Sequence, residues 1–190
     1  MGSKSDSFML YFALIPLLFM LIFSSCSLSC VWMKTKGDQS AFTKVTLSKM
    51  EVVTYNMERE KRTTTIDLSK ACDIDESNVK CVLYKGSKAT KALTGVTIAL
   101  TIATAAVSVL VGLCDMNKDC VEISAVLHGA LSSITVIFSL ITVVVYTSYS
   151  SDFPDEYGLA TGWILSLISA LVGSVITLIL SCTNVCMNVK

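Results

Sequence analysis

The sequence predicts an all-α membrane bundle of four transmembrane helices, with a small antiparallel β-sheet in a large first extracellular loop. Two observations support this fold class. Of the 190 residues, 53% are hydrophobic and the mean hydropathy is +0.65, which is far too apolar for an ordinary soluble domain. Four stretches also reach the roughly 20 apolar residues that a helix rising 1.5 Å per residue needs to cross a bilayer. We therefore expect a single four-helix transmembrane domain over residues 1–190.

The first span is expected at about residues 8–31 and contains the apolar run Phe12 to Phe23. It lies where a secretory signal peptide would lie, and Phe23-Ser24-Ser25-Cys26 resembles a bacterial lipoprotein cleavage box. Apolar character nevertheless continues to Trp32, beyond the length of a typical signal-peptide core. A retained helix is therefore favoured, and a cleaved helix that leaves three spans is the alternative.

The other three spans are expected at about residues 92–113, 121–146 and 158–181, and none has a charged residue in its middle. Their small residues recur four positions apart, a spacing that lets helix backbones approach closely. We expect these small residues to pack within the bundle, with an oligomer interface as the alternative. They are Gly158 and Gly162, Ala125 and Gly129, and Gly95, Ala99 and Ala103.

Charge predicts the orientation of the four spans. Lys4, Lys118 and Lys190 fall on the side of the termini, whereas the expected second outer loop, 150–157, holds three acids and no base. By the positive-inside rule this favours cytoplasmic termini. The twelve Lys and Arg residues of the expected first outer loop, 33–91, argue the other way, but the rule loses force for loops approaching about 60 residues.

In this topology, cysteines are expected on both sides of the membrane. Cys72 and Cys81 lie in the long loop, where an oxidising space would let them form a disulfide. Four others sit at the opposite membrane face and are candidates for reversible palmitoylation, or are simply small residues that lipid tolerates at helix ends. Their spacing, without a nearby His, fits zinc modules poorly. These four are Cys114, Cys120, Cys182 and Cys186.

The long loop is rich in β-branched and aromatic residues, which predicts strands. A first strand region covers 44–47 and 51–55, a second covers 63–68 and a third covers 80–84, with a turn at 56–62 and a break at 85–88. We expect a small antiparallel sheet that the cysteine pair holds against the helix ends.

No catalytic constellation is visible, so we expect neither an enzyme nor a cofactor. The lone His128 has no facing carboxylate, which favours a packing contact over a proton relay. Asp152, Asp155 and Glu156 lack the spacing of a calcium loop and are interpreted as a solvated acidic loop. The net charge of zero gives no bias toward nucleic acid. Membrane lipids, a second copy or a surface protein are the expected partners, and no small-molecule substrate is evident.

Short motifs resemble the amastins, four-helix surface proteins of trypanosomatid parasites. Val45-Thr46-Leu47 is similar to the centre of the amastin signature (Cys, aliphatic, Thr, Leu, Trp, Gly, any residue, Lys), although Lys44, Ser48, Lys49 and Glu51 replace its other residues. The stretches 88–93 and 157–163 also look amastin-like. This resemblance implies a non-enzymatic plasma-membrane protein that presents its large loop to another surface or to lipid.

The chain also resembles the claudins, which share this layout, and the resemblance rests partly on the same residues. Cys72 and Cys81 are similar to the claudin loop cysteine pair, Lys91-Ala92-Leu93 to Arg-Ala-Leu, and Gly162-Trp163 to the Gly-Trp of the fourth helix. The claudin Gly-Leu-Trp is absent, because residues 67–71 read Asp-Leu-Ser-Lys-Ala. The claudin alternative implies a junction protein that assembles side by side and sets paracellular permeability. The chain has no Asn-x-Ser/Thr sequon, so N-glycosylation is not expected.

Overall fold

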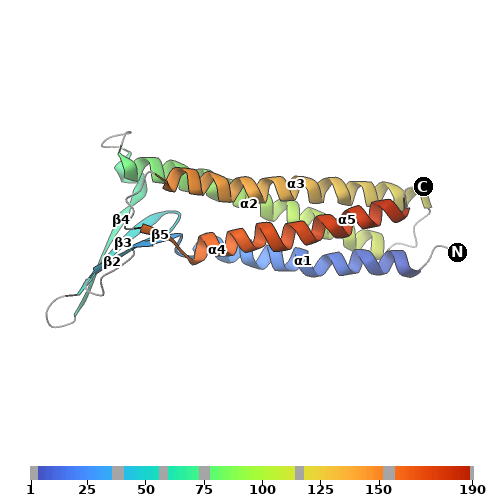
Figure 1. Ribbon diagram of the computed structural model, residues 1–190, viewed down its shortest axis with the longest axis horizontal. Helices are drawn as coiled ribbons and strands as arrows, with labels where there is room; N and C mark the ends of the chain where they lie inside the picture. Colours follow the sequence, from blue (N-terminus) through green and yellow to red (C-terminus); the bar gives the residue numbers. More distant parts are fainter. Residues whose placement is uncertain are drawn as a thin grey trace. The chain divides into compact units, whose positions relative to one another are not determined.

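The computed structural model describes residues 4–35, 41–55, 60–72, 78–113, 118–151 and 157–188 and is mostly helical. Its long helices are α1 (Lys4–Ser29), α2 (Val79–Leu113) and α3 (Lys118–Ser150) (Figure 1). A fourth helical segment consists of α4 (Thr161–Ile168), the π-helix η2 (Ser169–Ser174) and α5 (Val175–Asn188). The remaining elements are the 3₁₀ helix η1 (Leu68–Ala71) and the strands β1 (Met33–Thr35), β2 (Ala41–Val45), β3 (Lys49–Tyr55), β4 (Lys61–Asp67) and β5 (Tyr157–Leu159).

Four helical segments are long and apolar enough to cross a membrane, as judged by length and composition. They are Phe12–Ser29, Val79–Leu110, Glu122–Ser150 and Thr161–Thr183. The 35 residues of α2 correspond to about 52 Å of helix, whereas the hydrocarbon core is about 30 Å thick. The first turns of α2, which carry four lysines up to Lys91, therefore extend beyond the length that hydrocarbon can cover. The four segments favour a multi-pass membrane protein.

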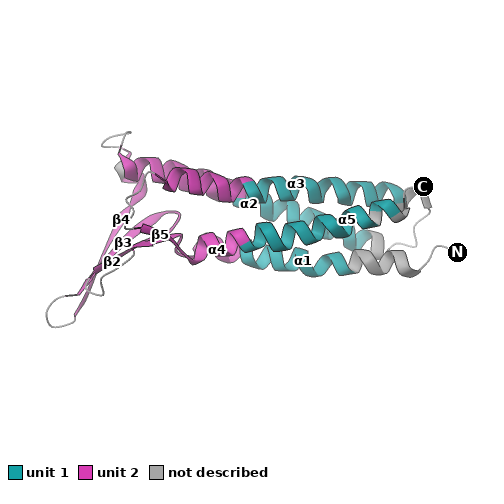
Figure 2. Ribbon diagram, viewed as in Figure 1, with its two compact units in different colours: residues 1–24, 94–140, 168–190 teal, residues 25–93, 141–167 magenta. Residues whose placement is uncertain are grey.

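The chain divides into two compact units (Figure 2). The first unit comprises residues 1–24, 94–140 and 168–190, and the second comprises residues 25–93 and 141–167. The first therefore holds one part of each long apolar segment, and the second holds the sheet together with the remaining parts.

The first unit has a polar interior and an apolar exterior. On α2, the hydroxyl residues alternate at spacings of three and four, so they form one stripe along the helix. All are buried, at most 2% exposed: Thr94, Thr97, Thr101, Thr104 and Ser108. Large aliphatic side chains point outward instead, including Leu18 at 59%, Ile102 at 52% and Ile123 at 67% exposed. A soluble bundle shows the reverse pattern, so this distribution suits a helix bundle surrounded by hydrocarbon.

Backbone carbonyls of the same helix accept hydrogen bonds from most of these buried hydroxyls. Thr101 donates to the carbonyl of Thr97 at 2.8 Å, and Ser108 donates to that of Thr104 at 3.1 Å. Other hydroxyls pair across helices of the same unit, as Ser24 does with Ser169 at 2.9 Å. A hydroxyl buried without a partner is costly. These bonds therefore allow a serine- and threonine-lined interior to form without a stability penalty.

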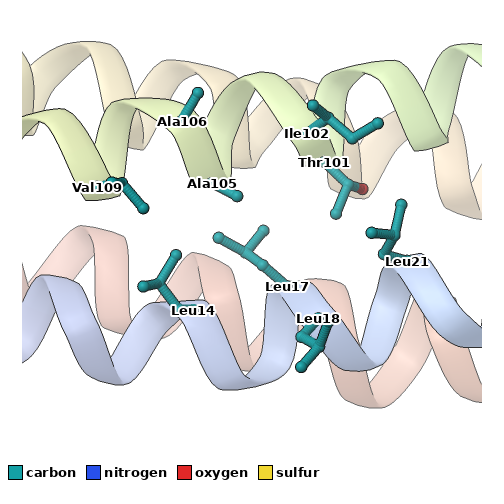
Figure 3. Close-up of a pocket in the computed structure, with 9 residues that line it drawn as sticks. All are labelled: Leu14, Leu17, Leu18, Leu21, Thr101, Ile102, Ala105, Ala106 and Val109. Carbon is teal, nitrogen blue, oxygen red and sulfur yellow. The ribbon is translucent and has the colours of Figure 1, made fainter.

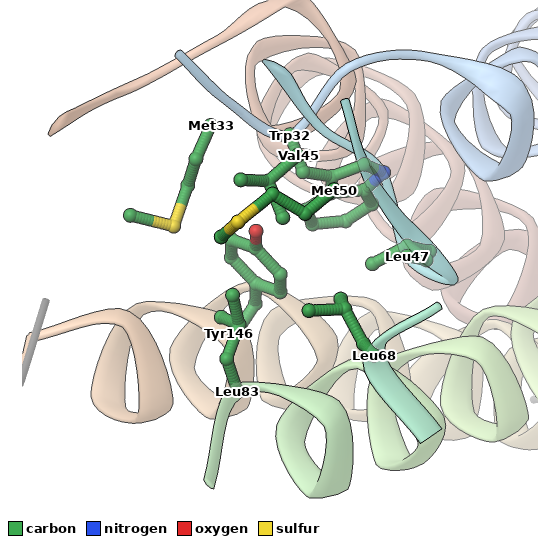
Figure 4. Packing of buried hydrophobic residues seen from close by; sticks show 8 residues of the cluster. All are labelled: Trp32, Met33, Val45, Leu47, Met50, Leu68, Leu83 and Tyr146. Carbon is green, nitrogen blue, oxygen red and sulfur yellow. The ribbon is translucent and has the colours of Figure 1, made fainter. Parts of the chain in front are cut away.

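In the second unit, five antiparallel strands form a sheet in the order β4-β3-β2-β1-β5. Strands β2 and β3 are joined by a tight turn, in which the Thr46 N–H donates to the Lys49 carbonyl at 2.9 Å and the Lys49 N–H donates to Thr46 Oγ1 at 3.1 Å. One face of the sheet packs on a hydrophobic cluster that includes Leu83 of α2 and Tyr146 of α3 (Figure 4).

The structure corrects several expectations about these elements. Residues 80–84 were expected to form a strand but belong to the first turns of α2. The Asn78 side chain caps this helix by accepting from the Lys80 N–H at 2.9 Å, and such a cap outweighs the β-propensity of the residues that follow. The expected break at 85–88 is likewise helical. Gly158, expected to open the fourth helix, lies in β5 opposite Lys34.

Two strands were not expected from the sequence. Strands β1 and β5 have three residues each and pair directly, with Met33 opposite Leu159 and Thr35 opposite Tyr157. The first expected strand region is in fact two strands, since the turn at Thr46 divides β2 from β3. Of the expected turn at 56–62, residues 56–59 lie outside the described part of the chain, and Lys61 already begins β4.

Candidate interaction surface on the sheet

The disulfide expected from the sequence is present. Cys72 and Cys81 are bonded, with their Cα atoms 4.7 Å apart. Cys72 caps the C-terminal end of η1, and Cys81 lies in the first turn of α2. The bond therefore fastens the end of strand β4, through η1, to the helix α2.

Trp32 is the anchor of the sheet's inner face. Its side chain is fully buried, its indole N–H donates to the Ser27 carbonyl at 2.6 Å, and its ring lies 4.6 Å from that of Tyr146. Its backbone N–H donates to the Val45 carbonyl, and its own carbonyl accepts from Ala160. Hydrogen bonds of this one residue therefore join the end of α1, strand β2 and the residue before α4.

Gly162 is required for this packing. A Cβ atom at this position would lie 2.5 Å from Cδ1 and 2.6 Å from Nε1 of Trp32. The Gly162 N–H also donates to the Val31 carbonyl at 2.7 Å. The Gly162-Trp163 pair noted in the sequence therefore has a structural reason, since the indole of Trp32 occupies the space of the missing side chain.

The outer face of the sheet carries an aromatic patch flanked by lysines. Strand alternation places Phe42 and Tyr55 on the face opposite the core, whereas Val53 on the same face is only 2% exposed and adds no accessible surface. The rings of Phe42 and Tyr55 lie 6.3 Å apart. The ammonium groups of Lys34 and Lys44 lie 5.3 Å and 5.1 Å from the centre of the Phe42 ring, within the range of a cation–π contact. We call Lys34, Lys44, Phe42 and Tyr55 the lysine–aromatic face.

Two acids on the same side of the sheet lie directly opposite lysines, one of which, Lys44, belongs to the lysine–aromatic face. Glu51 pairs across the strands with Lys44, and Asp67 pairs with Lys49. Asp67 also accepts hydrogen bonds from the backbone N–H and the hydroxyl of Ser69, which hold the pKa of its carboxyl below the ordinary value of 3.8. Lys34 lies opposite Lys44 and Gly158, neither of them an acid. The lysine–aromatic face therefore keeps a surplus of positive charge.

The Val45-Thr46-Leu47 segment has a structural role. Val45 and Leu47 are buried in the hydrophobic cluster, while Thr46 closes the β2–β3 turn. The next residue, Ser48, accepts from the ammonium group of Lys91 at 3.0 Å. This bond ties the turn to α2 within the second unit.

His128 belongs to a buried polar cluster of the first unit. Its Nδ1 lies 2.7 Å from the hydroxyl of Ser181, which also lies 2.8 Å from that of Ser132 and donates to the Thr177 carbonyl. Its Nε2 has no hydrogen-bond partner among the described residues. These contacts match the packing interpretation, because neighbouring helices meet at His128 through hydroxyls and none of the contacts is a carboxylate.

Small residues expected to pack within the bundle divide into two sets. Ala125 is 1% exposed, and a Cβ at Gly129 would come within 3.2 Å of Val185. By contrast, Gly95, Ala99 and Ala103 are exposed, and nothing lies within 4 Å of a Cβ built on Gly95. The expectation that this face of α2 packs within the bundle is therefore wrong, because the hydroxyl stripe takes the buried side of the helix.

The remaining expected sites are placed as follows. Cys182 and Cys186 are exposed free thiols near the end of α5, and Cys26 of α1 and Cys30, directly after α1, are free thiols as well. The expectations for Cys114 and for the side chain of Cys120 lie outside the described residues, as do those for Asp152, Asp155 and Glu156. Within the described ranges, no group of three or more His, Cys, Asp or Glu residues could hold a metal.

No protein-family model matches the chain, and no curated protein matches it.

Proposed function

We propose that this chain is a non-enzymatic, multi-pass protein of the plasma membrane, amastin-like in layout, with both termini in the cytoplasm. Its disulfide-pinned sheet lies outside the cell and contacts a negatively charged surface. The observation that carries the proposal is the lysine–aromatic face, which combines exposed aromatic area with surplus positive charge on a sheet whose other face is committed to the core.

Electrostatics support an anionic partner. Basic side chains near an anionic membrane contribute about 1 kcal/mol each, and an aromatic ring beside them adds apolar contact area. The sheet is held at both sides, by the disulfide at the end of η1 and by Trp32 at α1. Because the face is already ordered, binding need not order a loop first.

The test uses the full chain in nanodiscs of neutral lipid, with binding measured to vesicles that contain or lack anionic lipid. We expect selective binding to the anionic vesicles. Removing two lysines in a Lys34→Gln/Lys44→Gln variant should weaken it by about 30-fold, at about 1 kcal/mol per residue. The matched control is Arg62→Gln/Lys80→Gln, which removes the same charge away from the lysine–aromatic face and should bind nearly as the wild type does.

Equal weakening in both variants would show that only net charge matters and would contradict the role of the lysine–aromatic face. Experiments in cells distinguish the claudin-like alternative from our proposal. Side-by-side assembly predicts freeze-fracture strands and altered ion permeability across an expressing cell layer, and our proposal predicts neither.

A further inference from the structure

We propose that strand β4 pairs edge to edge with β4 of a second copy, so that two chains form a closed dimer through their sheets. Strand β4 is the outermost strand at one end of the sheet, whose order is β4-β3-β2-β1-β5. One of its edges pairs with β3 over the full length from Lys61 to Asp67. No backbone hydrogen bond joins the other edge to any segment in the described part of the chain.

This free edge of β4 is long and open. The strand has seven residues, and all are exposed except the half-buried Ile66. Every second residue of such an edge strand directs its N–H and C=O groups outward, where another strand can pair with them. Proteins usually protect a sheet edge with a proline, a bulge, a charge or a very short strand. The opposite edge strand, β5, has only three residues, whereas β4 has neither a proline nor a bulge, and its charges are confined to its ends.

The sequence of β4 points to a second copy as the occupant of this edge. Two antiparallel strands can pair only where outward-directed residues lie opposite each other. For two identical strands, the numbers of opposed residues must therefore add up to an even number. The register that pairs all seven residues meets this condition. It places Thr64 opposite Thr64 of the copy and Thr63 opposite Thr65, and it places Lys61 opposite Asp67.

This register is self-complementary in charge. Because the two strands run in opposite directions, Lys61 of each chain meets Asp67 of the other, once at each end of the interface. The two copies of Lys61 lie six residues apart along the strands, or about 20 Å. Opposite charges and threonine pairs that lie directly across two strands both stabilise the pairing. A shift to the next allowed register would separate Lys61 from Asp67 and leave two residues of each strand unpaired.

The dimer goes beyond the proposed function, because it does not depend on what the lysine–aromatic face binds. Lys61 lies opposite Tyr55 on β3, so the two side chains are on the same side of the sheet. Antiparallel pairing continues this side from one copy into the other, and the dimer therefore presents two lysine–aromatic faces on one surface. Such a two-fold interface is closed and adds no further copies.

Disulfide cross-linking of the full chain in detergent micelles tests the register. Every cysteine outside the Cys72–Cys81 disulfide is changed to serine, and one cysteine is introduced in each variant. Thr64→Cys should cross-link to its own copy under mild oxidation, because opposed Cα atoms of antiparallel strands are about 4.5–5.5 Å apart, within the range of a disulfide. Thr63→Cys and Thr65→Cys should cross-link poorly alone but efficiently when the two variants, carrying different tags, are mixed.

The matched control is Thr54→Cys. Thr54 is an exposed threonine of β3 that lies opposite Arg62, one strand away from the free edge, so it should show only the cross-linking that random collisions produce. All of these variants replace exposed threonines, and the fold should therefore tolerate them.

A charge change tests the pairing of Lys61 with Asp67. In the Thr64→Cys background, Lys61→Asp should lower the yield of cross-linked dimer by about tenfold, because two attractive pairs become two repulsive ones. The control Lys80→Asp makes the same change of charge on an exposed residue of α2 and should leave the yield unchanged.

Equal cross-linking of Thr54→Cys and Thr64→Cys, or a Thr64→Cys yield that Lys61→Asp does not lower, would overturn the proposal. Contact through the helices is the competing arrangement. In the first unit, Leu14 and Leu17 of α1 and Ala105 of α2 line an apolar crevice (Figure 3). Cross-linking of Ala105→Cys without cross-linking at β4 would place the contact there and would also overturn the proposal. None of these outcomes decides whether the lysine–aromatic face binds anionic vesicles, so the two proposals can fail separately.

Discussion

Replacing Gly162 with alanine tests whether the contact with Trp32 stabilises the second unit. The new Cβ would lie 2.5 Å from Cδ1 and 2.6 Å from Nε1 of the indole, closer than real Cβ contacts allow. The ring cannot shift freely, because its N–H is bonded to the Ser27 carbonyl and its face meets Tyr146. Overpacking costs about 1–3 kcal/mol, and loss of the buried N–H bond costs a similar amount. We expect a loss of about 3 kcal/mol in the free energy of unfolding.

The control is Gly95→Ala, since nothing lies within 4 Å of a Cβ at that position. Alanine is favoured over glycine inside a helix by up to about 1 kcal/mol, so this variant should be neutral or slightly more stable. Both variants are solubilised in detergent and unfolded with SDS, with tryptophan fluorescence as the readout. If Gly162→Ala unfolds with the wild-type free energy and an unchanged spectrum, the account of Trp32 as anchor is refuted.

Three further predictions use the same unfolding assay. Changing Cys72 and Cys81 to serine should cost about 2–3 kcal/mol by loop entropy, and a reductant should destabilise only the wild type. Because the folded pKa of Asp67 is lowered, its contribution is present above pH 3.8 and fades as the pH falls through the folded value. The variant Asp67→Asn should lack this pH-dependent loss of unfolding free energy. Ser181→Ala leaves both nitrogens of His128 without a hydrogen-bond partner among the described residues and should cost about 1–3 kcal/mol, whereas Ser133→Ala, which loses a bond to its own helix, should cost less.

The long apolar segments were predictable because hydropathy and length alone determine them, and composition likewise indicated a sheet. The error at residues 80–84 arose because Val82 and Tyr84 favour strands when read locally, whereas the Asn78 cap and the disulfide at Cys81 begin a helix there. Strands β1 and β5 have three residues each and depend on pairing between distant segments, which a local pattern does not show.

The packing face of α2 was predictable in principle. The small residues Gly95 and Ala99 suggested a packing face but lie on the exposed side of the helix. The hydroxyl residues from Thr94 to Ser108, spaced alternately three and four positions apart, form the buried side. On the candidate surface, the cysteine pairing followed from the sequence. The lysine–aromatic face did not, since Lys34 and Phe42 come together only through the register of β1 on β2.

The most direct test of the central claim is mass-tag labelling of Cys72 and Cys81 in intact cells, before and after an impermeant reductant. The free thiols Cys26 and Cys30, at and directly after the end of α1, are first changed to serine so that they add no signal. We predict that both cysteines are labelled only after reduction, which would place the disulfide-pinned sheet outside the cell. Labelling only after permeabilisation, and without reductant, would mean that the sheet faces the cytoplasm and would contradict the proposed surface role.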